Sequence, residues 1–182
     1  HVIRPIRESD LEDFSDLVGN IADGMTSLPH DPDFIFKRIH HSLHSFYPEI
    51  HEPGGGYYLF VLEDFTTSRI IGTSGILARV GGFDPFYTSR IVPEMRHYDP
   101  LGIDARIDSL HLQKNHKGPS ELCSLFLNPH YRSTGLGKLL SLVRFLFNKA
   151  FPERFEEELI AELRGYIDDS GEVPFWEAVG KK

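Results

Sequence analysis

The stretch SELCSLFLNPHYRSTGLGKLL, residues 120–140, decides the fold. Its first part, residues 120–127, is rich in apolar residues and predicts a buried strand, which Asn128 and Pro129 bring to an end. From Gly135 onward, apolar residues recur every three or four positions, which predicts a helix over residues 135–151. The chain is therefore expected to pass from a strand, through a short turn, directly into a long helix.

The turn between strand and helix, residues 132–137, has the properties of an anion site. Its two glycines let the backbone approach a phosphate closely, and the first N–H groups of the following helix point outward unpaired. The helix dipole favours negative charge there, and Arg132 and Lys138 add positive charge. The plainer alternative is a turn that only joins two elements. Neither the dinucleotide-binding nor the P-loop glycine pattern is present.

Length and composition indicate the class of protein. With 182 residues, 40% of them apolar, the chain predicts one globular domain, and a net charge of −8 argues against nucleic-acid binding. No segment approaches the roughly 20 apolar residues of a membrane helix, and the N-terminus lacks a signal-peptide pattern. We therefore expect a cytoplasmic protein without a membrane partner. Its single cysteine, Cys123, permits no intrachain disulfide.

Periodicity and turn signals predict the remaining elements. Ser9 and Glu12 form a candidate capping box for a first helix, and Asp31 with Pro32 starts a second helix whose apolar stripe is Ile35, Ile39, Leu43 and Phe46. The predicted strands are residues 2–6, 57–62, 69–78 and 159–163, with a hairpin between the second and third, and the last helix covers 174–179. Between them, residues 80–118 look irregular, with only a short strand at 110–113.

The order of elements and the R-x-x-G-x-G motif at 132–137 resemble the GCN5-related N-acyltransferase superfamily. That resemblance implies an α+β fold layered α/β/α, with a central, mostly antiparallel twisted sheet and helices on both faces. It also implies a bulged strand whose backbone holds pantetheine, followed by a turn that holds the pyrophosphate of coenzyme A (CoA). The cofactor-binding residues would be Leu125, Leu127, Arg132, Ser133, Thr134, Gly135, Leu136, Gly137 and Lys138.

Several longer strings are similar to a narrower family, arginine N-succinyltransferase. They are GMTSLP (24–29), YLFVLED (58–64), NHKGPSELCSLFLNPHYR (115–132) and PFWEAVGK (174–181). The resemblance implies transfer of succinyl from succinyl-CoA to the α-amino group of arginine, sometimes ornithine, in arginine catabolism. Succinyl-CoA or acetyl-CoA would be a cosubstrate, with no permanently bound cofactor and no metal.

Family members are longer, so residues 1–182 are expected to form a single acyltransferase domain, the N-terminal part of a larger protein. A second half, which carries a histidine regarded as the proton donor, lies outside these residues. A homo-oligomer and an alpha/beta heteromer are both open. Two other functions remain as alternatives: an N-acetyltransferase that acts on another amine with acetyl-CoA, and a non-catalytic CoA-binding subunit or fragment.

Acylation of an amine needs a base and a polarised carbonyl group. The resemblance places a base at Glu121, acting directly or through water, and His116 is the alternative because imidazole titrates near neutral pH. The N–H of Leu125 is the candidate donor to the carbonyl, whereas Cys123 is interpreted as a small buried thiol. Trp176 stands where many superfamily members have a tyrosine that protonates the leaving thiolate. Indole cannot donate in this way, so we expect Trp176 to be a packing residue.

The substrate-binding predictions concern both the acceptor and the acyl group. Thr26 and Ser27 follow the first helix, a region that shapes the acceptor site in the superfamily. The free carboxylate of a succinyl group suits a bidentate guanidinium, and Arg90 and Arg164 are the candidates.

Overall fold

The computed structural model describes residues 1–21, 25, 27–163, 165–168 and 170–180, except for the side chains of Phe83 and Val179. Its core is a five-stranded sheet in the order β1-β2-β3-β6-β7. Neighbours are antiparallel except β6 and β7, which are parallel. The predicted strands are confirmed, although the last is shorter than expected. The bounds are β1 Val2–Pro5, β2 Tyr57–Asp64, β3 Arg69–Leu77, β6 Ser120–Leu127 and β7 Leu159–Ile160.

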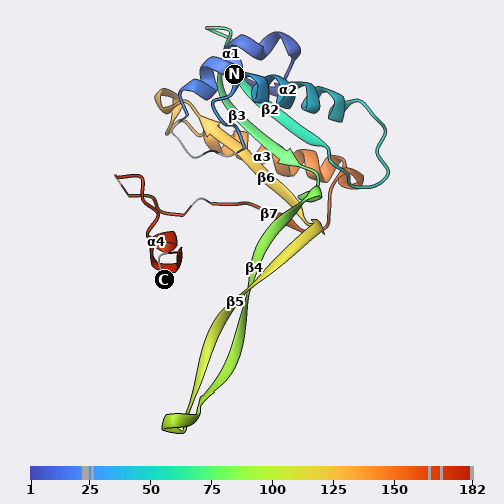
Figure 1. The fold of residues 1–182 in the computed structure, drawn as a ribbon. Coiled ribbons are helices and arrows are strands. Elements are labelled where there is room, and N and C mark those ends of the chain that lie inside the picture. The colour runs from blue at the N-terminus through green and yellow to red at the C-terminus, as the bar shows by residue number, and fades with distance from the viewer. Residues whose placement is uncertain (22–24, 26, 164, 169, 181–182) are drawn as a thin grey trace.

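Helices cover both faces of this sheet (Figure 1). On one face, α1 (Leu11–Gly19) and α2 (Pro32–Phe46) pack on alternate residues of β2, including Leu59 and Val61. On the other face, α3 (Leu136–Ala150) packs on Tyr58 and Phe60 of the same strand through Phe147. A strand buried on both faces is apolar at nearly every position, as YYLFVL is. The predicted α/β/α layering is confirmed.

The two N-terminal helices begin differently. The carboxylate of Asp31 accepts hydrogen bonds from the N–H groups of Asp33 and Phe34 at 3.0 and 3.3 Å, so the predicted start of α2 is confirmed. The predicted capping box at Ser9 is wrong. A short 3₁₀ helix, Glu8–Asp10, precedes α1, and Asp10 instead accepts from the N–H of Arg7 at 2.7 Å. The observed capping box joins Arg7 and Asp10, so it begins two residues before the predicted one at Ser9 and Glu12.

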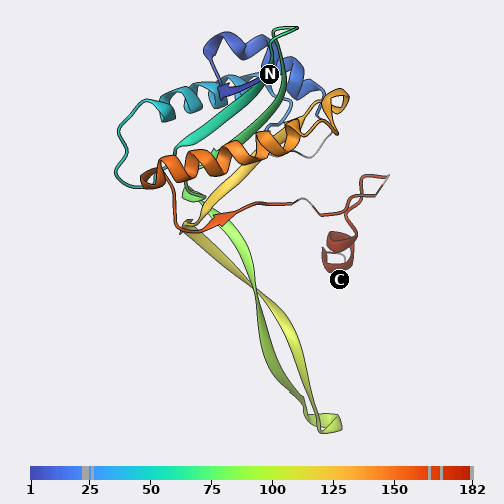
Figure 2. The same ribbon diagram turned by 180° about the vertical axis from the view of Figure 1, so that it is seen from behind.

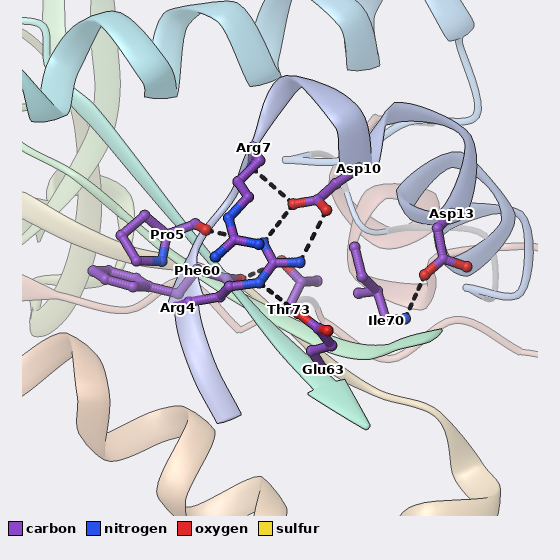
Figure 3. A network of polar contacts seen from close by, with 9 residues as sticks. All are labelled: Arg4, Pro5, Arg7, Asp10, Asp13, Phe60, Glu63, Ile70 and Thr73. Carbon is purple, nitrogen blue, oxygen red and sulfur yellow. Dashed lines mark hydrogen bonds and ion pairs between the residues drawn. The ribbon is translucent and has the colours of Figure 1, made fainter. Parts of the chain in front are cut away.

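A polar network ties α1 to the edge of the sheet (Figure 3). Arg4 of β1 donates to Glu63 of β2 at 2.6 Å and to both carboxylate oxygens of Asp10 at 2.6 and 2.9 Å. Asp13 of α1 accepts the N–H of Ile70 at the start of β3. Because Arg4 and Asp10 are largely shielded from solvent, these contacts are screened less than surface ion pairs. The network therefore fixes the start of α1 and the short 3₁₀ helix before it against the sheet.

A long two-stranded ribbon projects from the sheet (Figures 1 and 2). It consists of β4 (Gly81–Tyr98) and β5 (Ile103–Lys117), paired antiparallel and joined by the turn Asp99–Leu101. The expectation of an irregular connection with a short strand at 110–113 is wrong. Both faces of the ribbon expose polar and apolar residues alike. Its sequence therefore lacks the alternation of apolar and polar residues by which a half-buried strand is identified.

The segment after β7 runs away from the sheet and ends in α4 (Pro174–Gly180), as both views show. Trp176 is 64% exposed and its ring contacts that of Phe175. Trp176 was expected to be a packing residue, and here it packs on Phe175 while most of its surface stays exposed. None of the helices in the described ranges combines the length and apolar character that a membrane crossing requires.

Candidate active site

The strand β6 contains a bulge, as predicted. Cys123 pairs with Gly75 and Phe126 pairs with Thr73, so Ser124 and Leu125 together face one residue of β3. Ser124 has a φ of +53°, which is unusual for a residue other than glycine. Its hydroxyl is buried and forms a hydrogen bond of 2.5 Å with the hydroxyl of Tyr57, which holds the bulge. Bulges re-aim a strand locally, and here Leu125 is 40% exposed.

Beyond the bulge, one edge of β6 is open. The short strand β7 pairs with β6 only through Ser120 and Glu121. In the described part of the chain, no strand pairs with that edge from Cys123 onward. The carbonyl of Cys123 accepts from Arg144 of α3 at 3.4 Å. The edge near Leu125 is thus free to form main-chain hydrogen bonds with an extended ligand.

The turn after β6 forms an open cradle at the N-terminus of α3. Gly135 has a φ of +83°, and its carbonyl accepts from the N–H groups of Lys138 and Leu139. A Cβ placed on Gly135 would meet no atom within 4 Å, so the space beside it is empty of protein. Arg132 is exposed and turns back to the carbonyl of Leu127 at 3.4 Å. The cradle is not closed by its own side chains.

The cradle is also electropositive. Arg132 and Lys138 lie in the cradle itself, and residues 122–152 contain no aspartate or glutamate, in a chain whose net charge is −8. The other two cations of this segment lie farther along α3, where Arg144 is buried and Lys149 is in the last turn. All nine predicted cofactor-binding residues lie on β6 from the bulge onward or in residues 132–138. Among them, Ser133 also has a positive φ, and Thr134 donates to the carbonyl of Tyr131 at 2.7 Å. In the first turn of α3 the N–H of Gly137 has no partner among the described residues, and that of Leu136 has only a 3.5 Å contact with Thr134 Oγ1. Together with the helix dipole, this makes the end of the strand suited to an anion.

A cavity of about 290 Å³ lies at the other end of β6. It is lined by residues from six stretches of the chain: the loop after α1, α2, β2, the stretch from the end of β3 into β4, β6, and the segment after β7. Its lining residues are Ser27, Arg38, Tyr57, Leu77, Val80, Gly81, Asp84, Pro85, Phe86, Glu121, Cys123 and Glu162.

Glu121 has the properties of a base in this cavity. Burial raises the pKa of its carboxyl group, and the nearby charge of Glu162 raises it further, while Arg38 acts in the opposite direction. A carboxylate whose pKa is raised toward the working pH takes up a proton more readily. Perturbed carboxyl groups in cavities are frequent at catalytic sites.

Arg38 was missed by reasoning from the sequence. The carbon of its guanidinium lies 4.1 Å from the ring centre of Tyr57 and 4.7 Å from that of Phe34. Asp84 and Glu162 were missed as well. No local signal distinguishes these residues from other surface charges, because the fold alone brings them to one cavity.

The other predicted site residues have different positions. Ser27 lines the cavity, whereas Thr26 and Arg164 lie outside the described residues. His116 is exposed at the base of the ribbon, with its Nδ1 2.8 Å from the carbonyl oxygen of Gly82. Arg90 pairs with His111 on the ribbon, and neither His116 nor Arg90 lines the cavity.

Cys123 lines the cavity but is not suited to be a nucleophile. Its side chain is buried, and burial raises the pKa of its thiol. The reactive form of a cysteine is the thiolate, which a raised pKa disfavours. The interpretation of Cys123 as a buried thiol is consistent with this environment.

Comparison with known proteins gives relatives along the whole chain. The family model described as arginine N-succinyltransferase beta subunit matches residues 1–182. An arginine N-succinyltransferase from Yersinia pestis is 41% identical over 179 residues, and one from Enterobacter is 39% identical over 181. These matches cover 98% and 100% of this chain but 51% and 52% of the relatives, so the chain spans about half their length.

Solved structures agree with the fold. Arginine/ornithine succinyltransferase subunit AI from Pseudomonas aeruginosa superposes with a TM-score of 0.89 at 35% identity, over 98% of this chain and 54% of that one. An acetyltransferase of the GNAT family from Staphylococcus aureus is 15% identical, with a TM-score of 0.51 over 98% of this chain and 78% of that one. The fold is that of the GCN5-related N-acyltransferases, and the chain belongs to the arginine N-succinyltransferase family.

Proposed function

We propose that this chain binds succinyl-CoA and presents its thioester to the α-amino group of arginine or ornithine, as part of an arginine N-succinyltransferase. The observation that carries the proposal is the position of β6. One end of this strand leads into an open, positively charged cradle, and the other end places Glu121 in an acidic cavity. An anionic donor and a cationic acceptor would thus meet along a single strand.

The donor would lie along the open edge of β6. In this proposal its pyrophosphate accepts hydrogen bonds from the N–H of Gly137, which has no partner in the described structure, and from the N–H of Leu136, whose contact with the Thr134 hydroxyl is long at 3.5 Å. Arg132 and Lys138 lie nearby. From Leu127 to Glu121, the strand spans roughly 20 Å at about 3.3 Å per residue, which leaves room for an extended pantetheine arm. Main-chain groups of Leu125 and Leu127 would hold that arm. The N–H of Leu125 would then donate to the thioester carbonyl.

The acceptor amine would react from the cavity. Glu121 removes a proton from the α-ammonium group, and the amine nitrogen attacks the thioester carbonyl carbon. The negative charge that develops on the carbonyl oxygen is stabilised by the N–H of Leu125. The C–S bond then breaks, the attacking nitrogen gives up its second proton to solvent as the amide forms, and the thiolate leaves and takes up a proton. No covalent enzyme intermediate is needed.

An assembly is part of the proposal. The matching family is described as a beta subunit, and the Pseudomonas aeruginosa relative is named as subunit AI. We place this chain in the cytoplasm, in a homo-oligomer or an alpha/beta heteromer, where a further polypeptide region would supply the proton for the leaving thiolate. The chain's own contribution is the donor cradle and the base.

The test is release of free CoA thiol from succinyl-CoA. The proposal expects release that depends on arginine or ornithine and is weak with acetyl-CoA. Equal rates with acetyl-CoA and unrelated amines would contradict it in favour of a general N-acetyltransferase. Saturable CoA binding without turnover under all conditions, including addition of the remaining region of the relatives, would leave only a CoA-binding subunit.

A further inference from the structure

The charges around the cavity form an unusual set. Among the described lining residues, three are carboxylates, Asp84, Glu121 and Glu162, and one is a cation, Arg38. No ion pair within 4 Å joins Arg38 to any of these three carboxylates in the described structure. The cavity therefore offers separate anionic and cationic partners to a ligand.

The guanidinium of Arg38 is held in place by aromatic rings, while its N–H donors have no partner in the part of the chain that the structure describes. It stacks against the rings of Tyr57 and Phe34, at 4.1 and 4.7 Å, and Tyr57 is itself fully buried and bonded to Ser124 of the bulge. No hydrogen bond from Arg38 to a described residue is present, although arginine carries five N–H donors. A planar guanidinium clamped by two rings, with unpaired donors beside a cavity, is a preorganised receptor for a carboxylate.

We infer that Arg38 binds the α-carboxylate of the amino-acid acceptor and that Glu162 and Asp84 bind its cationic side chain. The inference rests on the proposed function and assigns the acceptor's contacts within the same site. Because the α-amine and the α-carboxylate are separated by one carbon, a carboxylate held at Arg38 places the amine beside Glu121. Arg38 is thus a specificity residue for amino acids over simple amines.

Charge complementarity favours the acceptor over the succinyl group as the partner of Arg38. Free arginine carries two cationic groups and one carboxylate, which matches a lining of three carboxylates and one guanidinium. A succinyl group carries one carboxylate and no cation, so it would meet the repulsion of the three acidic side chains. The cavity volume of about 290 Å³ also lies near the lower limit of roughly 300 Å³ for small-molecule sites, which favours a small ligand.

The experiment compares L-arginine with agmatine, which has the same guanidinium and chain but lacks the α-carboxylate. Calorimetric titrations use the full chain with and without saturating CoA. Arg38→Gln should weaken arginine binding by roughly 10- to 150-fold, as expected for loss of a charged hydrogen-bonded contact, and leave agmatine binding unchanged. Lys37→Gln, which removes a charge from the exposed face of the same helix, should change neither. Arg38→Lys keeps the charge and should give an intermediate loss, which preserves the test if the glutamine variant folds poorly.

Three results would overturn the inference. The first is an equal loss of arginine and agmatine binding in Arg38→Gln. The second is unchanged arginine binding together with loss of the preference for succinyl-CoA over acetyl-CoA, which would assign Arg38 to the donor. The third is wild-type protein that binds CoA but not arginine. CoA affinity should be the same in all variants, and absence of CoA binding in the wild type would count against the proposed function instead.

Discussion

The candidate sites at the two ends of β6 use different chemical groups, main-chain groups at one end and side chains at the other. The cradle at residues 132–138 is made of main-chain groups, a left-handed glycine and a helix terminus, and its charge is positive. The cavity around Glu121 is lined by residues from six separate segments of the chain. Three of the lining side chains are carboxylates. A backbone site tolerates changes of side chain but not of backbone conformation. A site built from side chains is sensitive to changes of those side chains. This contrast determines which substitutions should matter at each end of β6.

The largest effect is expected at the cavity. Glu121→Gln keeps the shape of the side chain but removes the base, so amine-dependent release of CoA should fall roughly 10²- to 10⁴-fold. CoA affinity should not change. Because burial raises the pKa of Glu121, its charged form is disfavoured in the fold, and the neutral glutamine should not lower the melting temperature at pH 8. Glu157→Gln, an exposed carboxylate outside the cavity, is the matched control. A variant that stayed active would exclude Glu121 as the base.

The next largest effect, on stability and CoA affinity, is expected at Tyr57, which contacts both the bulge of β6 and Arg38 in the cavity. Its hydroxyl bonds to Ser124 of the bulge, while its ring lies under Arg38. Tyr57→Phe keeps the ring and leaves a buried hydroxyl without its partner, so the free energy of unfolding should fall by about 1–3 kcal/mol. Urea unfolding measures this change. CoA affinity should fall with it, because the bulge loses its support; an unchanged affinity would show that the bulge does not depend on Tyr57.

At the cradle, two glycines should differ. Gly135→Ala places a side chain at a φ of +83°, a strain of about 1–2 kcal/mol, and should weaken CoA binding through the changed backbone. Gly137 lies within α3, and a Cβ there would be in ordinary contact with Leu127 at 3.5 Å. Gly137→Ala should therefore leave the free energy of unfolding unchanged or raise it slightly. Calorimetry with CoA and thermal unfolding on both variants make the comparison. Equal behaviour of the two would argue against a backbone-built cradle.

The smallest effect is a shift with pH. The charge of Glu162 raises the pKa of Glu121, so Glu162→Gln should lower that pKa. A base acts when it is deprotonated, and activity is therefore lost as the pH falls through its pKa. The acid limb of the kcat/KM profile should move to lower pH in Glu162→Gln. An unmoved limb, or one displaced to higher pH, would separate Glu162 from the titration of the base.

The same contrast explains what could be predicted from the sequence. The cradle lies within one contiguous strand–turn–helix segment, so its glycines and its placement were visible in the sequence, as were the strands and helices of the body. A bulge in the strand at residues 120–127 was expected from the family resemblance, and the structure places it at Ser124 and Leu125. Arg38, Asp84 and Glu162 are ordinary surface charges in the sequence, and only the packing of distant segments brings them together. The ribbon was missed because its two faces are both exposed, so no periodic burial marks its strands.

The most direct test of the central claim is amide hydrogen exchange with and without CoA. The account predicts slower exchange at residues 125–127 and at residues 136 and 137 when CoA is bound, with no change on the distal part of the ribbon. Protection confined to other segments, or the absence of any saturable change, would contradict the assignment of β6 and the start of α3 as the donor site.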